Sequence, residues 1–409
     1  MFSMYFTEQP MSTYPEEEAR KAGQNTLVFS NKHFDPVEGS RLYNERLEEY
    51  LYAEDVGFDG IMLNEHHNTP LCMQAKIHVF ASVLAGMTKR VKIVLLGYPL
   101  PVAENPIQLA EEIGMVDMLS KGRIVSGFVR GAGQEQFASN VNPAYNRERF
   151  KESHDVIIKI WSEPGPFRWE GEHYQLRVVN PWVLPLQKPH PRIWIPGMAS
   201  LETIVWAAEH RYPYIALNTT VKDTKRIWEL YDKTADRMGY KSGPEQRGYL
   251  IRCHVAETEE KALRGGEEFR WEQRGEAKGA PQPPVWVSPP GYSSAAARMR
   301  LRSDMEKQRV DSYQNDIDSG SIIAGTPDQV IQRLRILLQE TRPSILSLMG
   351  NHGRVNHEDS MTCIRLLGEE VLPAVREIGK ELGLDSPFEL NTPVSLASTP
   401  QSGLHPAKV

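Results

Sequence analysis

The sequence has few cysteines, no basic block and no long apolar segment, and each absence excludes a class of protein. Cys72, Cys253 and Cys363 are an odd number without metal-ligand spacing, so we expect neither a disulfide framework nor a metal site, but a reducing, cytoplasmic environment. A net charge of −6 without a basic block argues against nucleic acid as a partner. No apolar run approaches the roughly 20 residues of a membrane span. The first residues lack the pattern of a signal peptide, so we expect no membrane association.

A Gly-x-Gly-x-x-Gly motif is also absent after the first apolar run, which argues against a Rossmann dinucleotide site. The 409 residues, 40% hydrophobic and 24% charged, have the composition of a globular protein. Eight strand-like apolar runs alternate with helix-like segments: 2–6, 61–63, 91–96, 124–129, 192–195, 214–217, 249–255 and 344–349. This alternation predicts parallel strands joined by helices. Eight such units favour an α/β fold of the (β/α)8 TIM barrel type, with a doubly wound open sheet as the alternative.

The chain is expected to form one barrel domain over residues 1–384. The charged segment 257–318, with a proline-rich stretch inside it, interrupts the strand–helix pattern and is interpreted as an insertion. Residues 385–409 are rich in Pro, Ser and Thr without periodicity, so we expect a mobile tail.

The second apolar run, 61–63, ends abruptly in Asn64, Glu65, His66 and His67. In a barrel this cluster falls at the carboxyl ends of the strands, where active sites lie. A histidine that titrates near neutral pH can move a proton, so His66 is a candidate catalytic residue, and Glu65 either orients it or bonds the backbone. Adjacent strand residues point to opposite faces, so we do not expect His66 and His67 to share a metal ion; His67 is interpreted as a structural neighbour.

Two further strand ends carry groups suited to an anion. Arg130 with Gly131 and Gly133 follows the fourth run, and an arginine there can donate paired hydrogen bonds to the oxygens of a phosphate. Ser200 and Thr203 follow the fifth run at the start of a helix, whose N–H groups and dipole also attract anions. Ordinary helix capping by Ser200 and a rim salt bridge of Arg130 are the alternatives. Tyr98, after Gly97, suits either a flat apolar ligand or core packing.

Four motifs in this order resemble the bacterial luciferase-like flavin monooxygenases over about 2–379. The first is Gly57-Phe58-Asp59-Gly60 with Asn64-Glu65-His66-His67; the second comprises Asn105-Pro106, Leu119-Ser120-Lys121-Gly122-Arg123 and Gly127-Phe128-Val129-Arg130-Gly131. The third is Pro196-Gly197-Met198-Ala199-Ser200 through Trp206-Ala207-Ala208, and the fourth is Gly325-Thr326-Pro327.

The resemblance implies a barrel that binds reduced FMN supplied by a separate NAD(P)H-dependent flavin reductase. It also implies that O2, as co-substrate, forms a flavin C4a-(hydro)peroxide that oxygenates an organic substrate, in a homodimer or homotetramer. By position, the resemblance assigns residues as follows: Arg130, Ser200 and Thr203 to the FMN phosphate, Ala199 to backbone contacts, Gly97 and Tyr98 beneath the flavin ring, and His66 to catalysis.

Where bacterial luciferase has a reactive cysteine before this arginine, the chain has Val129, so light emission on aldehydes is not expected. Two alternatives stay open: hydride transfer with the deazaflavin F420 on the same barrel, and a flavin-binding protein without catalysis. The presence of Glu65, His66 and Arg130 weighs against the latter. Trp169, Trp182 and Trp286 suit an organic substrate of some size, but do not decide between carbonyl insertion, hydroxylation and sulfonate cleavage.

Overall fold

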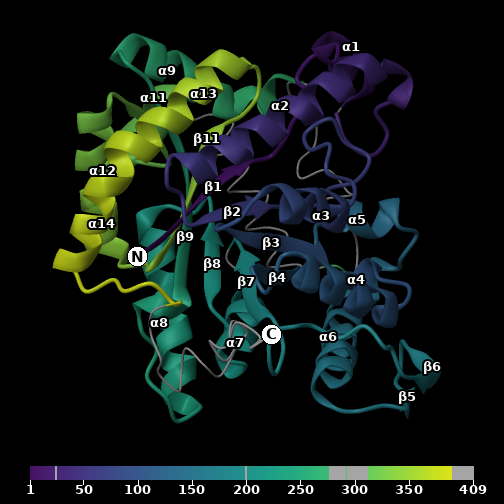
Figure 1. Ribbon diagram of the computed structural model, residues 1–409. Coiled ribbons are helices and arrows are strands. Elements are labelled where there is room, and N and C mark those ends of the chain that lie inside the picture. Colours follow the sequence, from purple (N-terminus) through teal and green to yellow (C-terminus); the bar gives the residue numbers. More distant parts are fainter. Residues whose placement is uncertain (24, 199, 276–291, 293–311, 389–409) are drawn as a thin grey trace.

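The structure is a computed structural model that describes residues 1–23, 25–198, 200–275, 292 and 312–388. Within these residues, eight parallel strands close into a barrel, as the sequence predicts (Figure 1). Closure requires that the first and last strands pair, and β1 pairs with β11 from Phe2 opposite Ile345 onward. The strands are β1 (Phe2–Thr7), β2 (Gly60–Leu63), β3 (Lys92–Pro99), β4 (Ile124–Val129), β7 (Arg192–Gly197), β8 (Tyr214–Leu217), β9 (Arg247–Val255) and β11 (Ile345–Asn351).

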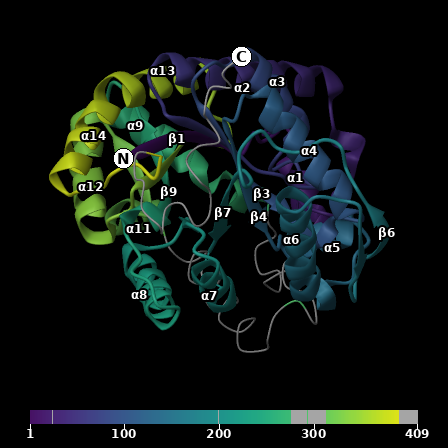
Figure 2. The ribbon, with the colours of Figure 1, turned by 60° about the horizontal axis from the view of Figure 1, so that its bottom comes forward.

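Helices form the outer layer and surround the strands (Figure 2). Several begin where the sequence predicts, because a capping residue precedes a proline: the Asn105 side chain accepts the N–H of Ile107, and Thr326 forms a capping box with Gln329. The helices are α1 (Glu16–Ala22), α2 (Pro36–Asp55), α3 (Ile77–Met87), α4 (Pro106–Leu119), α5 (Gly133–Ala138), α6 (Asn146–Ser162), α7 (Leu201–Glu209), α8 (Val221–Arg237), α9 (Glu259–Glu267), α11 (Tyr313–Ser319), α12 (Pro327–Thr341), α13 (His357–Leu366) and α14 (Leu372–Glu381).

Three further strands do not belong to the eight-stranded barrel. β10 (Ile322–Gly325) extends the edge of β9 beyond the point where β8 ends. The antiparallel pair β5 (Phe167–Glu170) and β6 (Gln175–Val179) packs on α6, where the indole of Trp169 donates to Glu152. Much of the expected insertion, 276–291 and 293–311, lies outside the described residues, as does Trp286.

Alternate residues of each strand belong to two apolar layers, which is the pattern of a filled barrel. Met4, Met62 and Val94 pack in the inner cluster. Tyr5 and Ile61 pack in the outer cluster, between the strands and the helices.

The amino-terminal end of the barrel is closed by the chain after α14. Phe388 packs on Phe2 and Trp194, and Arg192 donates to the carbonyl of Pro387. Residues 385–388 of the expected tail are therefore packed, while 389–409 lie outside the described residues.

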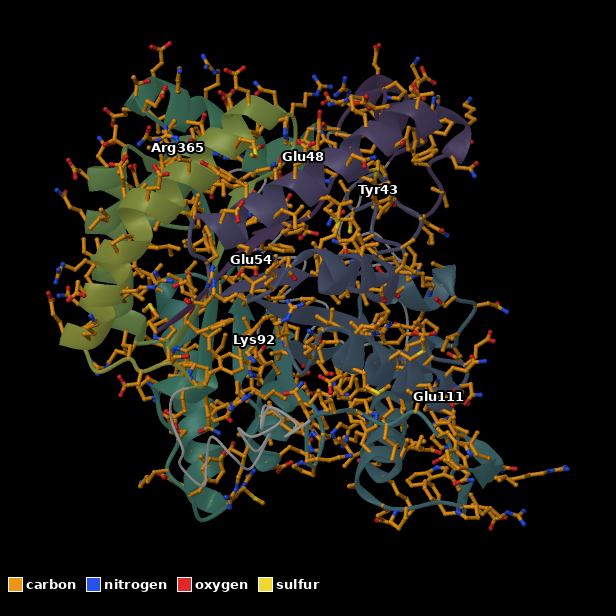
Figure 3. The ribbon with its side chains drawn as sticks, viewed as in Figure 1. Tyr43, Glu48, Glu54, Lys92, Glu111 and Arg365 are labelled. Atoms are coloured by element: carbon orange, nitrogen blue, oxygen red, sulfur yellow. The ribbon has the colours of Figure 1, made fainter. Side chains whose placement is uncertain are left out.

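The turn that leads into β3 is held by the end of α2. The Glu54 carboxylate accepts the backbone N–H groups of Lys89, Arg90 and Val91. Glu54 and Lys92, the first residue of β3, are labelled in Figure 3. In the described part of the chain, every helix is too short or too polar to cross a membrane.

Candidate functional site

A pocket of about 110 Å³ opens at the carboxyl ends of the barrel strands. Its walls come from seven of the eight barrel strands or the residues after them, and from α5. The lining residues are Phe6, Glu8, Met62, Asn64, Glu65, His66, Leu96, Gly97, Pro99, Val129, Gly131, Glu135, Pro196, Leu217, Asn218 and Leu250. Of the residues proposed from the sequence, Glu65, His66 and Gly97 line this pocket, whereas Arg130, Ser200 and Thr203 are not among its lining residues.

His66 and His67 both turn toward one carboxylate at this pocket. Nδ1 of His66 lies 2.9 Å from Oε1 of Glu135, and Nδ1 of His67 lies 2.7 Å from Oε2. The expectation that these neighbours diverge is wrong, because β2 ends at Leu63 and strand alternation does not extend to them. Among the described residues, no group of three or more His, Cys, Asp and Glu side chains could hold a metal ion.

Glu135 was not among the residues expected from the sequence. It lies on the short helix α5, after a turn in which Gly131 has a φ of +70°. Its side chain is 1% exposed. Burial alone raises a carboxyl pKa, but the hydrogen bonds from His66 and His67 outweigh burial and hold the pKa of Glu135 at about 2.

Glu65 is also buried, but it contacts His67 rather than His66. Its Oε2 accepts the backbone N–H of Ile77 at 2.8 Å, at the start of α3, and its Oε1 lies 3.5 Å from Nε2 of His67. Burial raises the pKa of Glu65, against the lowering effect of the Ile77 hydrogen bond and of nearby Lys76.

Gly97 and Tyr98 lie at the end of β3, where the pairing register with β4 shifts between Leu95 and Tyr98. The peptide bond between Leu96 and Gly97 is cis. Gly97 lines the pocket, whereas the Tyr98 ring belongs to the outer cluster, 5.5 Å from the ring of His78. Any contact of Tyr98 with a ligand in the pocket would therefore involve its backbone.

Arg130 follows β4 and lies beside the start of α7. One guanidinium nitrogen donates to Oδ1 of Asn146 at 2.8 Å, and the other donates to Oγ of Ser200 at 3.5 Å. The ring of Tyr292 lies 5.1 Å from the guanidinium carbon. Asn146 and Tyr292 were not expected from the sequence, because only the fold brings them to Arg130.

Ser200 precedes α7, but its side chain makes no capping hydrogen bond to the helix backbone. Its hydroxyl instead accepts from Oγ1 of Thr203 at 3.1 Å and donates to Oε2 of Glu202 at 3.3 Å. Ordinary capping therefore does not explain the hydroxyl of Ser200. Ala199 lies outside the described residues.

The Glu202 carboxylate lies at the same helix start. It lies 3.3 Å from the guanidinium of Arg147. Its own backbone N–H, together with Arg147 and the Ser200 hydroxyl, lowers the pKa of Glu202 despite some burial. A carboxylate bonded to a helix N-terminus and an arginine occupies the position that an anionic ligand would take.

A buried hydroxyl lies next to this cluster. The Tyr214 side chain is fully buried, and its oxygen has no hydrogen-bond partner within the described part of the chain. A Cβ added at Gly197 would lie 2.4 Å from that oxygen, which places the hydroxyl directly against the end of β7. Buried hydroxyls are normally bonded, so this one is a donor suited to a ligand or to the adjacent turn.

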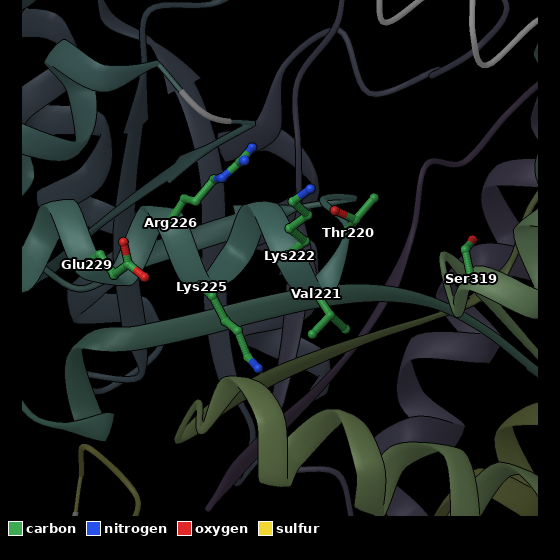
Figure 4. Close-up of a pocket in the computed structure, with 7 residues that line it drawn as sticks. All are labelled: Thr220, Val221, Lys222, Lys225, Arg226, Glu229 and Ser319. Atoms are coloured by element: carbon green, nitrogen blue, oxygen red, sulfur yellow. The ribbon is translucent and has the colours of Figure 1, made fainter.

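A second depression, of about 540 Å³, lies on the outer side of the barrel along α8 (Figure 4). It is lined by Thr220, Val221, Lys222, Lys225, Arg226, Glu229 and Ser319. Two of its four charged lining residues form surface ion pairs, Lys225 with Glu340 and Arg226 with Asp223. The pocket at the strand ends therefore remains the candidate functional site.

The chain is similar to known proteins in both sequence and fold. The family model described as luciferase-like monooxygenase matches residues 26–343. The alkanal monooxygenase alpha chain of Photorhabdus luminescens is 31% identical over 192 residues, which cover 46% of this chain and 52% of that protein. The oxygenase component of the flavin-dependent trigonelline monooxygenase of Acinetobacter baylyi is 31% identical over 41% of this chain and 47% of its own length.

Among solved structures, the oxygenating constituent of 3,6-diketocamphane monooxygenase from Pseudomonas putida, in complex with FMN, has the same fold. Its TM-score is 0.67 at 18% identity, over 91% of this chain and 98% of that chain. The matches span 52%, 67% and 52% of the length of the first three curated relatives.

Proposed function

Because the chain belongs to the luciferase-like monooxygenase family, we propose that it is the oxygenase of a two-component, FMN-dependent monooxygenase. In this proposal it takes reduced FMN and O2 and oxygenates an organic substrate. The observation that carries the proposal is the cluster of anion donors beside the pocket: Arg130, Arg147, Ser200 and Thr203 around the start of α7.

These residues fit the phosphate of FMN. Arg130 can offer two parallel N–H groups, and the hydroxyls of Ser200 and Thr203 can turn outward once an anion replaces the Glu202 carboxylate. The hydroxyl of Tyr214, which has no hydrogen-bond partner among the described residues, lies against Gly197 at the end of β7. Gly97, which lines the pocket, is the residue proposed to lie beneath the flavin ring.

Bound reduced flavin supplies the electrons that activate oxygen. The protein's own part is to bind, orient and protonate. His66 lines the pocket and can hold or move a proton beside the reacting atoms. Glu65, bonded to the backbone at Ile77, supports His67 and through it this wall of the pocket.

A separate flavin reductase is the proposed partner. The Acinetobacter baylyi relative is described as an oxygenase component, which supports a division between a reductase and an oxygenase. The substrate is proposed to be a small organic molecule. Two tryptophans that the sequence suggested for substrate contact do not line the pocket: Trp169 packs on α6, and Trp182 is 93% exposed. Three unpaired, buried cysteines are in keeping with a reducing, cytoplasmic compartment.

We also propose a homo-oligomer that buries an apolar stripe on α3 and α4. Val79, Val83 and Met87 recur at intervals of four residues along α3 and are 40–67% exposed. Met115, Met118 and Leu119 are exposed on neighbouring α4. Contiguous exposed apolar side chains favour contact with a second copy of the chain.

The test is an anaerobic titration of the protein with reduced FMN, followed by mixing with O2 and a panel of organic substrates. We expect binding of reduced FMN and incorporation of ¹⁸O from labelled O2 into a product. Binding of reduced F420 in place of FMN, with reduction that needs no oxygen, would favour the deazaflavin alternative. Flavin binding with no change in the reaction of flavin with oxygen would favour a non-catalytic binding protein.

A further inference from the structure

Glu135 lines the pocket, and its carboxylate contacts both His66 and His67. We propose that Glu135 is a positioning residue that holds His66 and His67 in one tautomer, with the proton on Nδ1 and the lone pair of His66 on Nε2. The catalytic consequence rests on the proposed function, whereas the tautomers are a property of the protein alone.

The geometry assigns one carboxylate oxygen to each ring. Oε1 of Glu135 lies 2.9 Å from Nδ1 of His66, and Oε2 lies 2.7 Å from Nδ1 of His67. The carboxylate is therefore bonded on both sides, and neither ring can turn without breaking its contact with a carboxylate that is 1% exposed. Gln134 adds a longer contact of 3.5 Å to Oε1.

The protonation states of the two rings follow from which atoms can donate and which can accept a hydrogen bond. A carboxylate with a pKa of about 2 is ionised at neutral pH and can only accept hydrogen bonds. Each Nδ1 must then carry a hydrogen, and in a neutral imidazole the lone pair is left on Nε2. A carboxylate behind the ring also stabilises the imidazolium that forms when Nε2 takes a proton.

The surroundings of Nε2 differ between the two rings. Nε2 of His66 lies 4.0 Å from Oε2 of Glu8, and both residues line the pocket. Nε2 of His67 instead lies 3.5 Å from Oε1 of Glu65, and that oxygen also lies 3.8 Å from Nζ of Lys76. The other oxygen of Glu65 accepts the backbone N–H of Ile77. His66 is thus the ring whose Nε2 faces the pocket, whereas His67 links Glu135 to Glu65, which is bonded to the start of α3.

The decisive variant is Glu135→Gln, which keeps the shape but replaces one acceptor oxygen by an NH2 donor. An amide can accept from only one Nδ1–H, so one of the two rings must lose its partner or move its proton to Nε2. In the unliganded wild-type protein, ¹⁵N NMR at pH 7.5 should give Nδ1–H signals for both rings. In Glu135→Gln, one ring should lose that signal.

The turnover rate and its pH dependence should change in the same variant. In Glu135→Gln, kcat should fall roughly 10²-fold, while the affinity for reduced FMN stays within about twofold. The acid limb of the pH–rate profile should move to lower pH, because the imidazolium of His66 loses its carboxylate but keeps Glu8. Glu135→Asp, which retains an ionised acceptor, should recover part of kcat.

Glu112→Gln is the matched control, because Glu112 also contacts a histidine, His78, at 3.0 Å but lies outside the pocket and is half exposed. It should change neither kcat nor the signals of His66 and His67. Wild-type protein with Nδ1 of His66 unprotonated would overturn the proposal, as would an unchanged kcat in Glu135→Gln. If the tautomers are as proposed but no FMN-dependent activity exists, the positioning role stands and the proposed function fails.

Discussion

A guanidinium nitrogen of Arg130 lies 3.5 Å from the hydroxyl of Ser200, although 70 positions separate the two residues in the chain. The barrel brings them together, because β4 and β7 pair side by side and each residue follows the carboxyl end of its strand. On the other side of β4, Gly127 allows a close approach to β3, because a Cβ there would lie 2.0 Å from the carbonyl oxygen of Leu95. This relationship supports the proposed phosphate site and leads to specific expectations.

Glu202→Gln should raise the affinity for FMN by about two- to fivefold, the effect of removing one partly screened charge. The carboxylate competes for the Ser200 hydroxyl and for Arg147, so its removal frees both donors and relieves repulsion of the phosphate. Affinity for riboflavin, which has no phosphate, should not change. A fluorescence titration with both flavins checks this, and weaker FMN binding in the variant would instead make Glu202 part of the binding surface.

Lys92 should make stability depend on pH above neutrality. Burial, with Arg192 and Arg123 nearby, lowers the pKa of Lys92 to about 8, whereas an unfolded chain keeps a lysine pKa of about 10.4. Between these values the unfolded state binds more protons, so stability rises with pH from about 8 to 10.4. Lys92→Met should be more stable at pH 7, by about 2 kcal/mol, and should lack this rise.

Urea unfolding at pH 7, 8, 9 and 10 measures the difference. The pH dependence of other groups cancels when the two proteins are compared. An identical slope in wild type and variant would show that Lys92 does not titrate in this range.

Phe388→Ala should lower the free energy of unfolding by about 2–4 kcal/mol. The ring packs on Phe2 and Trp194, and the guanidinium of Arg192 lies 4.6 Å from its centroid. Trp182→Ala is the control, because a side chain that is 93% exposed should contribute little. Equal urea midpoints for Phe388→Ala and wild type would mean that this end of the chain does not stabilise the barrel.

The oligomer should depend on the apolar stripe of α3 and α4. Val79→Glu and Met115→Glu place charges on that stripe, and each should shift the protein from dimer or tetramer to monomer in light scattering after size exclusion. Ile336→Glu, on α12 and 61% exposed, is a control on a different helix and should not change the mass. Wild-type protein that is monomeric at micromolar concentration would refute the proposal.

The barrel was predictable because its signal is periodic and local. Each of the eight strands is a short apolar run followed by a glycine or polar residues, and the helices between them carry recognisable caps at Asn105 and Thr326. β10 was not predicted, because four residues, Ile322–Gly325, following a charged segment give too weak a pattern. The β5–β6 hairpin also has a weak pattern, because most of its residues are exposed or half-buried.

From the sequence, candidate site residues could be proposed only where a residue follows the end of a strand. Arg130 and Ser200 were found in this way and do lie together. Glu135 and Asn146 were missed, because they reach the site from helices after the strand, and no local pattern marks such a residue. Tyr98 faces the outer layer, since the register shift at the end of β3 alters the simple alternation of strand residues.

The most direct test of the proposed flavin site compares Arg130→Ala with wild type in binding FMN and riboflavin. Loss of charge-assisted hydrogen bonds, worth about 1.5–3 kcal/mol each, should weaken FMN binding roughly 10- to 100-fold. Riboflavin binding should stay within about twofold, because only the phosphate contacts Arg130 in this account. Unchanged FMN affinity, or an equal loss for both flavins, would contradict a phosphate site at Arg130 and Ser200.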